Sequence, residues 1–247
     1  LMLVLGGSAA LVAIAPLIKL ITRKEKKELE AESDSIHIPK HPTLEMKNWL
    51  QFIRQAWPLV FVHLATIFAD AVYWTGGAVL SKQLATESTM GKFVFPAYML
   101  PTLLVPLILG EQQNSKRTLK KASVILMMIG LIYSLFAIAT KPSILLPLSF
   151  TLGLAVASIV PLSEGVFTRL AVQLKRKKRH LIGFHSALFS FPYIVGPLLY
   201  GYLDSRFSPQ IAFLSIGIGI TLVSFLVLGL GIINISIKNR TIKDWKD

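Results

Sequence analysis

The chain has 247 residues, a net charge of +13 and a mean hydropathy of +0.60, with 53% hydrophobic and 16% charged residues. A water-soluble globular protein carries about a quarter charged residues, so this composition excludes an ordinary soluble domain. The excess of basic residues would suit a nucleic-acid-binding protein, but their placement, described below, decides against that class. Because the chain has no cysteine, disulfides and thiolate metal sites are also excluded.

Seven long apolar runs predict membrane-spanning helices. A helix rises about 1.5 Å per residue, so about 20 apolar residues match the hydrocarbon core, whereas barrel strands are much shorter. Lipid cannot form hydrogen bonds with the N–H and C=O groups of the backbone, whereas a helix satisfies these groups internally. The third run is short and contains three prolines. We expect an all-α integral membrane protein of about seven transmembrane helices, at residues 2–21, 57–80, 93–109, 122–140, 144–172, 181–203 and 211–237.

The polar segments between these runs suggest four parts of the chain. Residues 44–56 form an amphipathic pattern, with Trp49, Phe52 and Ile53 on one helical face, which predicts a helix lying in the membrane interface. The expected parts are a first transmembrane helix (1–21), a cytoplasmic loop with this interfacial helix (22–56), a six-helix transmembrane bundle (57–237) and a cytoplasmic tail (238–247).

The basic residues lie almost entirely on one side of the predicted membrane. Only Lys82, Lys92, Lys141 and Arg206 fall in the loops after the second, fourth and sixth spans. Loops rich in Lys and Arg stay cytoplasmic, so the C-terminus is predicted inside, in a bacterial-type plasma (inner) membrane crossed several times. The basic run at 175–180 is then a cytoplasmic loop near anionic lipid, and no nucleic-acid partner is expected.

The second span carries polar residues on one helical face. His63, Thr66, Asp70 and Tyr73 follow the spacing of helical turns, and Asp70 lies near the middle of the span. A carboxyl group at that depth is a candidate for reversible proton binding, with His63 about 10 Å nearer the cytoplasm and Thr66 and Tyr73 lining the path. The alternative is that Asp70 pairs with a polar group on another helix and only orients packing.

The fifth span adds further polar candidates. Thr151 and Ser158 are predicted to line a cavity. Glu164 lies about 9 Å nearer the cytoplasm than Ser158, so we do not expect it to pair with Asp70. Glu164 is a candidate for the transport site or for a cytoplasmic gate that bonds to Arg169 or to the basic loop.

Small residues in the sixth span predict close helix packing. Gly196, Pro197 and Gly201 form a packing or hinge segment. His185, near the cytoplasmic end, is interpreted as an interface histidine with ordinary partners.

Motifs of enzymes are missing from the sequence. It contains no GxSxG, HExxH, Walker A or GxGxxG pattern, and we expect no enzyme activity, no cofactor and no metal. Two alternatives remain open: a free-standing seven-helix receptor or scaffold, and, with less support, a membrane-embedded enzyme.

The order of the predicted elements resembles the major facilitator superfamily: one helix, a long charged cytoplasmic loop and six more helices. The basic run at 175–180 followed by Gly196, Pro197 and Gly201 is similar to that family's tenth and eleventh helices and the loop between them. The resemblance implies the second half of a transporter whose N-terminal half precedes this chain. It further implies alternating access and a small-molecule substrate, with Asp70 and Glu164 on cavity-lining helices.

Overall fold

The computed structural model describes residues 42–109, 115–173 and 178–231, and the regular structure in them is helical throughout. The chain separates into two units, Leu1–Glu45 and Met46–Asp247. Only residues 42–45 of the first unit are described, so the description below concerns the second unit. The predicted first span (2–21), most of the loop before the bundle and the tail (238–247) lie outside the described residues.

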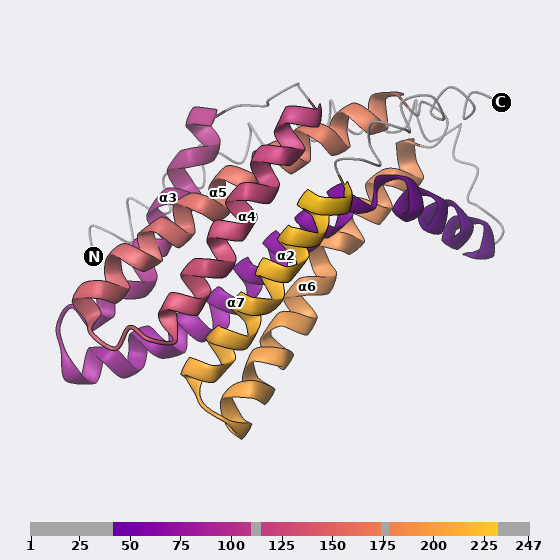
Figure 1. The fold of residues 1–247 in the computed structure, drawn as a ribbon. Coiled ribbons are helices and arrows are strands. Elements are labelled where there is room, and N and C mark those ends of the chain that lie inside the picture. Colours follow the sequence, from indigo (N-terminus) through magenta and orange to yellow (C-terminus); the bar gives the residue numbers. More distant parts are fainter. Residues whose placement is uncertain (1–41, 110–114, 174–177, 232–247) are drawn as a thin grey trace, which may run out of the picture. The chain divides into compact units, whose positions relative to one another are not determined.

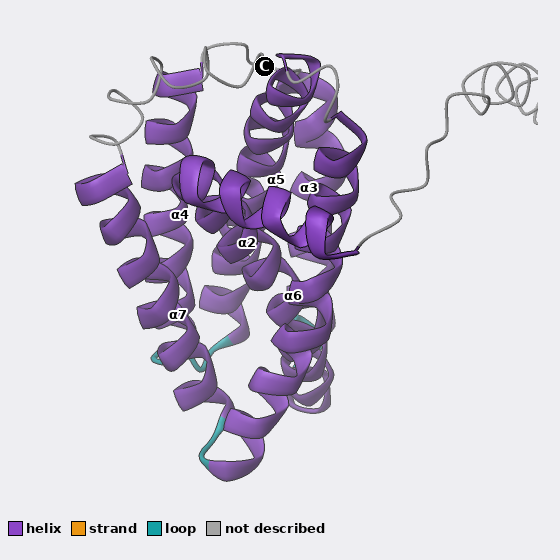
Figure 2. Cartoon of the chain, turned by 90° about the vertical axis from the view of Figure 1, so that its right-hand side faces the viewer, coloured by secondary structure: helices purple, strands orange, loops and turns teal. Residues whose placement is uncertain are grey.

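The helices follow one another with short connections (Figures 1 and 2). They are α2 (Pro42–Glu87), η1 (Gly91–Phe93), α3 (Val94–Leu109), α4 (Ser115–Phe136), α5 (Pro142–Gln173), α6 (Lys178–Arg206), α7 (Pro209–Leu226) and the π-helical turn η3 (Val227–Gly231). Five of them contain a stretch long and apolar enough to cross a membrane, and α3 is apolar but shorter. The prediction of an all-α membrane protein is confirmed.

Helix α2 contains a sharp kink that separates a short arm from its membrane-spanning part. Ala56 has non-helical backbone angles, φ −113° and ψ 22°. The cause is Pro58, which lacks an amide hydrogen and whose ring crowds the carbonyl of Arg54, four residues earlier. Residues 46–55, the part of the arm that belongs to the second unit, run crosswise to the other helices in Figure 2. Its residues include the helix predicted at 44–56.

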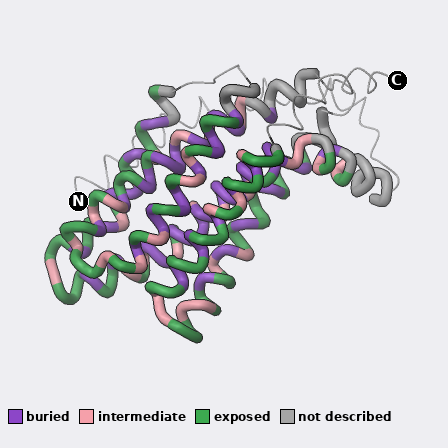
Figure 3. The backbone as a smooth tube through the Cα atoms, in the orientation of Figure 1, coloured by how far each residue is buried: buried purple, intermediate pink, exposed green. Residues whose placement is uncertain are grey.

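The helices of the bundle bury one face each and expose the other, as Figure 3 shows by the alternation of buried and exposed turns. Helix α3 packs along α5, and α4 packs along both α5 and α7. The span in α2 is the most deeply buried of the five, and the one in α6 is the most exposed. Helix α2 is therefore the element whose polar residues most need partners from other helices.

Two glycines set the close approach of α4 and α7. A β-carbon on Gly217 would lie 2.7 Å from the carbonyl oxygen of Gly130 and 2.7 Å from the hydroxyl of Ser134. Ser208 caps the start of α7, because its side chain accepts a hydrogen bond from the Ile211 amide at 3.2 Å. The small residues Gly130 and Gly217 let α4 and α7 approach closely, and such contacts allow membrane helices to associate without a hydrophobic driving force.

Candidate functional site

Asp70 lies near the middle of the span in α2, and two other helices donate hydrogen bonds to its carboxylate. Tyr98 of α3 donates to Oδ1, and Tyr193 of α6 donates to Oδ2. Tyr98 is fully buried, whereas Tyr193 is 37% exposed and Asp70 is partly exposed. A carboxylate only accepts hydrogen bonds, so two hydroxyl donors satisfy it and tie α2 to both neighbours. These three residues are called the Asp70 cluster below.

Close packing brings the Tyr98 hydroxyl to Asp70. Helix α3 crosses α5 at Gly153, where a β-carbon would lie 3.0 Å from the Tyr98 carbonyl carbon. The Tyr98 ring packs against Tyr73, with ring centroids 4.4 Å apart. Tyr133 of α4 donates a hydrogen bond to the backbone carbonyl of the residue before Asp70. The backbone of α2 and the Tyr98 ring are therefore both held in place around the carboxylate.

A second polar cluster lies about 10 Å along α2 from Asp70. Here His63 of α2, Glu164 of α5 and His185 of α6 each bring one potential ligand atom within 4.8 Å of the others. His185 Nε2 is 3.0 Å from Glu164 Oε1, although the two groups are not aligned as a hydrogen bond. His63 Nδ1 is 3.0 Å from the Oγ of Ser163. His63, Ser163, Glu164 and His185 are called the histidine cluster below.

The contacts of Ser163 are compatible with a tautomer of neutral His63 that leaves Nε2 open. The Ser163 hydroxyl lies 3.0 Å from the carbonyl of Val160, and when it donates there its oxygen accepts from His63. In that arrangement Nδ1 of His63 carries the proton, and Nε2 keeps a lone pair. His63 is fully buried, and its Nε2 has no hydrogen-bond partner among the described residues. Such an unpaired buried atom is costly, so this nitrogen is a candidate for a function.

Aromatic rings surround the two histidines. The Phe167 ring lies edge-on to His63 and to His185, with centroid distances of 5.3 Å and 4.8 Å. The two imidazole rings are 4.9 Å apart. Phe52, from the arm of α2, continues this wall by contacting Phe167 and Phe184. The apolar wall limits the access of water to the imidazole nitrogens.

Four further residues were predicted to line a cavity, and each of their hydroxyls has a hydrogen bond inside the bundle. Thr66 is buried and donates to a carbonyl of its own helix at 2.7 Å, and Tyr73 is fully buried and donates to Ser149 at 2.6 Å. Thr151 is exposed and Ser158 is partly exposed, and each donates at 2.7 Å to the carbonyl four residues earlier. The structure does not gather these four around one site, and their role in a cavity stays a prediction.

The packing segment predicted in α6 is divided in the structure. A β-carbon on Gly196 would lie 3.2 Å from the Ala71 Cβ, so Gly196 marks the close approach of α6 to α2. A β-carbon on Gly201 would meet nothing within 4 Å. Pro197 lies inside the continuous helix α6 and is partly buried. A hinge at these residues stays a prediction.

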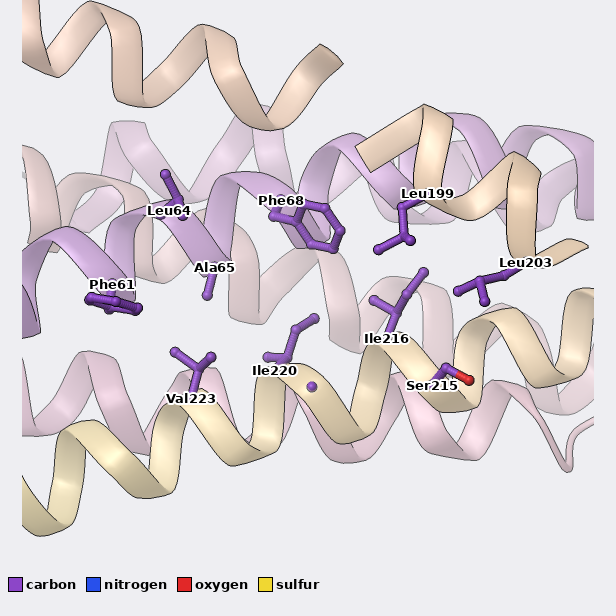
Figure 4. A pocket seen from close by; sticks show the side chains of 11 residues that line it. Phe61, Leu64, Ala65, Phe68, Leu199, Leu203, Ser215, Ile216, Ile220 and Val223 are labelled. Carbon is purple, nitrogen blue, oxygen red and sulfur yellow. The ribbon is translucent and has the colours of Figure 1, made fainter. Parts of the chain in front are cut away.

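An apolar cavity of about 340 Å³ lies between α2, α6 and α7, and no residue of either polar cluster lines it (Figure 4). Ser215 is the one polar residue among those that line it. The others are Phe61, Leu64, Ala65, Phe68, Leu199, Leu203, Ile216, Gly219, Ile220 and Val223. This lining suits an apolar chain or ring and offers no group for chemistry.

The sequence analysis singled out Asp70, His63 and Glu164 as candidates but not the residues that contact them, Tyr98, Tyr193, Ser163 and His185. Tyr98 and Tyr193 read as ordinary aromatic residues of apolar helices, because periodicity within one helix says nothing about which helix lies beside it. His185 was interpreted as an interface residue. No protein-family model, curated protein or solved structure matches this chain.

Proposed function

We propose that this chain forms one six-helix half of a secondary transporter of the major facilitator type, which moves a small solute by alternating access and couples that movement to protons at Asp70. The observation that carries the proposal is the Asp70 cluster: a carboxylate deep in an apolar helix, held by hydroxyls from two other helices. The proposal includes a preceding N-terminal half, a bacterial-type plasma membrane and a cytoplasmic C-terminus, as the distribution of basic residues predicts.

The depth of Asp70 supports a functional reading of its carboxyl group. Asp70 is 14 residues after Ala56, where the span begins, which is about 21 Å along the helix axis. An ionisable group in the hydrocarbon region costs several kcal/mol, and such groups typically mark ion or proton pathways. The partial exposure of Asp70 and Tyr193 gives protons a side from which to reach the carboxylate.

The hydrogen bonds supply a way for proton binding to move helices. In its charged form Asp70 accepts one hydrogen bond at each oxygen, from Tyr98 and from Tyr193. A protonated carboxyl group donates from one oxygen, so the hydroxyl that faces this oxygen turns to accept or moves away. The charge-assisted hydrogen bonds also become neutral ones of about half the strength, so proton binding weakens the ties from α2 to α3 and α6. Protonation of one residue would thus alter contacts among three helices, α2, α3 and α6. Coupling of proton binding to alternating access requires such a link.

The same hydrogen bonds would also suit a carboxylate that only orients helix packing, and one substitution separates the two roles. Asp70→Asn keeps the size and an acceptor oxygen but cannot bind or release a proton. The protein, in full length as encoded, would be reconstituted in vesicles with a trapped pH indicator. A panel of sugars, amino acids and lipophilic cations would then be screened for solute-induced proton movement.

We expect Asp70→Asn to abolish proton movement driven by the active solute and to retain solute exchange in the absence of a pH gradient. Asp204→Asn, near the end of α6, is the matched control and should behave as the wild type. Undiminished proton-coupled transport by Asp70→Asn would remove Asp70 from the mechanism. Equal loss of exchange and coupling, with impaired folding, would assign Asp70 to packing.

A further inference from the structure

We propose that His63, Glu164 and His185 bind a divalent transition-metal ion of the zinc class, which joins α2, α5 and α6. This inference is independent of the transport proposal, because it concerns a different cluster and does not require proton coupling. Two observations carry it: the convergence of three ligand atoms from three helices, and the fully buried lone pair of His63 Nε2.

The geometry of the three side chains is close to that of a metal site. Their potential ligand atoms lie within 4.8 Å of one another, and His185 Nε2 is 3.0 Å from Glu164 Oε1. A tetrahedral zinc ion with bonds of about 2.0–2.1 Å holds its ligand atoms about 3.3 Å from each other. Small rotations of the side chains are enough to move from one arrangement to the other.

The hydrogen bond to Ser163 prepares His63 as a ligand. A histidine that binds a metal usually donates its second ring N–H to a nearby oxygen, which fixes the tautomer and the ring orientation. Here Nδ1 lies 3.0 Å from the Ser163 oxygen and can donate to it when the Ser163 hydroxyl donates to the Val160 carbonyl. In that tautomer Nε2 presents a lone pair, and it has no hydrogen-bond partner among the described residues. His185 Nε2 likewise has no aligned hydrogen bond.

The types of ligand decide the class of metal. Calcium and magnesium prefer sites made of oxygen ligands, whereas two imidazoles suit zinc and its neighbours in the first transition series. Two histidines and one glutamate form a zinc ligand set that keeps one position open for water or another ligand. The side chains of His185 and Glu164 are 22% and 35% exposed, so the cluster is less buried at these two residues than at His63, although Nε2 of both histidines is itself buried.

The test is zinc binding by the purified full-length protein in detergent after a chelator has removed all metal. Bound zinc per chain, affinity and thermal unfolding would be measured during titration with ZnCl2. We expect one tightly bound zinc per chain and a rise in melting temperature that saturates with it, because an ion that binds the folded state stabilises it. Bound Co²⁺ should give the visible absorption of a tetrahedral ion.

Variants locate the zinc and keep the test independent of folding. His63→Gln, Glu164→Gln and His185→Gln should each weaken zinc binding by more than about tenfold, and Ser163→Ala, which leaves every ligand in place, by about tenfold. Glu87→Gln, which removes an exposed carboxylate at the end of α2, should bind zinc as the wild type does. Ser163→Ala and Glu164→Gln decide the question if a histidine variant fails to fold.

Two results would overturn the proposal. One is the absence of tight zinc binding by the metal-free wild type. The other is an affinity for zinc that Ser163→Ala, Glu164→Gln and Glu87→Gln all share with the wild type, because the zinc would then be bound elsewhere on the chain.

Discussion

The two polar clusters of α2 lie about 10 Å apart on the same helix, yet they balance hydrogen-bond donors and acceptors in opposite ways. In the Asp70 cluster the carboxylate receives one hydroxyl donor at each oxygen. In the histidine cluster, Nε2 of His63 and Nε2 of His185 lie near the Glu164 carboxylate, and neither nitrogen has an aligned hydrogen bond among the described residues. The first cluster is complete by itself, and the second leaves ring nitrogens that a cation would use.

This difference separates what each cluster can do for stability. The Asp70 cluster ties α2 to α3 and α6 in the protein alone, because both donors belong to the chain. The histidine cluster contributes full stability only when a cation joins its ligands. Substitutions that disturb the first should therefore cost more in metal-free protein than substitutions in the second.

We expect the largest loss of stability from a substitution where α3 packs against α5, because this contact places Tyr98 beside Asp70. Gly153→Val adds a side chain where α3 and α5 touch, with its β-carbon 3.0 Å from the Tyr98 carbonyl carbon. We expect it to lower the unfolding free energy in mixed micelles by about 3 kcal/mol, the upper range for overpacking. Gly183→Val, near the histidine cluster, meets nothing within 4 Å and should cost less than about 0.5 kcal/mol. Equal costs for the two variants would refute this account of how α3 is placed.

The two tyrosines of the Asp70 cluster should differ in their effects. Tyr98→Phe removes a fully buried donor to a carboxylate, and we expect it to cost about 2 kcal/mol, as hydrogen bonds to charged groups do. Tyr193→Phe removes a donor whose ring is 37% exposed, so water can replace it and the expected cost is below about 1 kcal/mol. Both values come from unfolding in mixed micelles at the same pH. A larger cost for Tyr193→Phe would mean that α6, not α3, is the main tie to α2.

The sequence was sufficient for the helices that the structure describes, and it singled out His63, Asp70 and Glu164 without their partners. Apolar runs and helical periodicity depend on neighbours along the chain, so they predicted the spans and the polar face that holds His63 and Asp70. Tyr98 and Tyr193 could not be assigned, because their role depends on which helices become adjacent. A similar predicted depth in the membrane could have pointed to the histidine cluster. The sequence analysis placed His63, Glu164 and His185 each towards the cytoplasmic end of its span, and the structure shows that they lie together.

The smallest expected effect belongs to His63 in metal-free protein. His63→Leu keeps the volume nearly constant and removes both the buried Nε2, which has no partner among the described residues, and the contact of Nδ1 with Ser163. The Ser163 hydroxyl keeps its hydrogen bond to the Val160 carbonyl. We therefore expect the unfolding free energy in the presence of a chelator to change by less than about 1 kcal/mol. Unfolding in mixed micelles with and without a chelator measures this directly. A loss as large as that of Tyr98→Phe would show that the histidine cluster is complete without a cation, and the contrast between the two clusters would disappear.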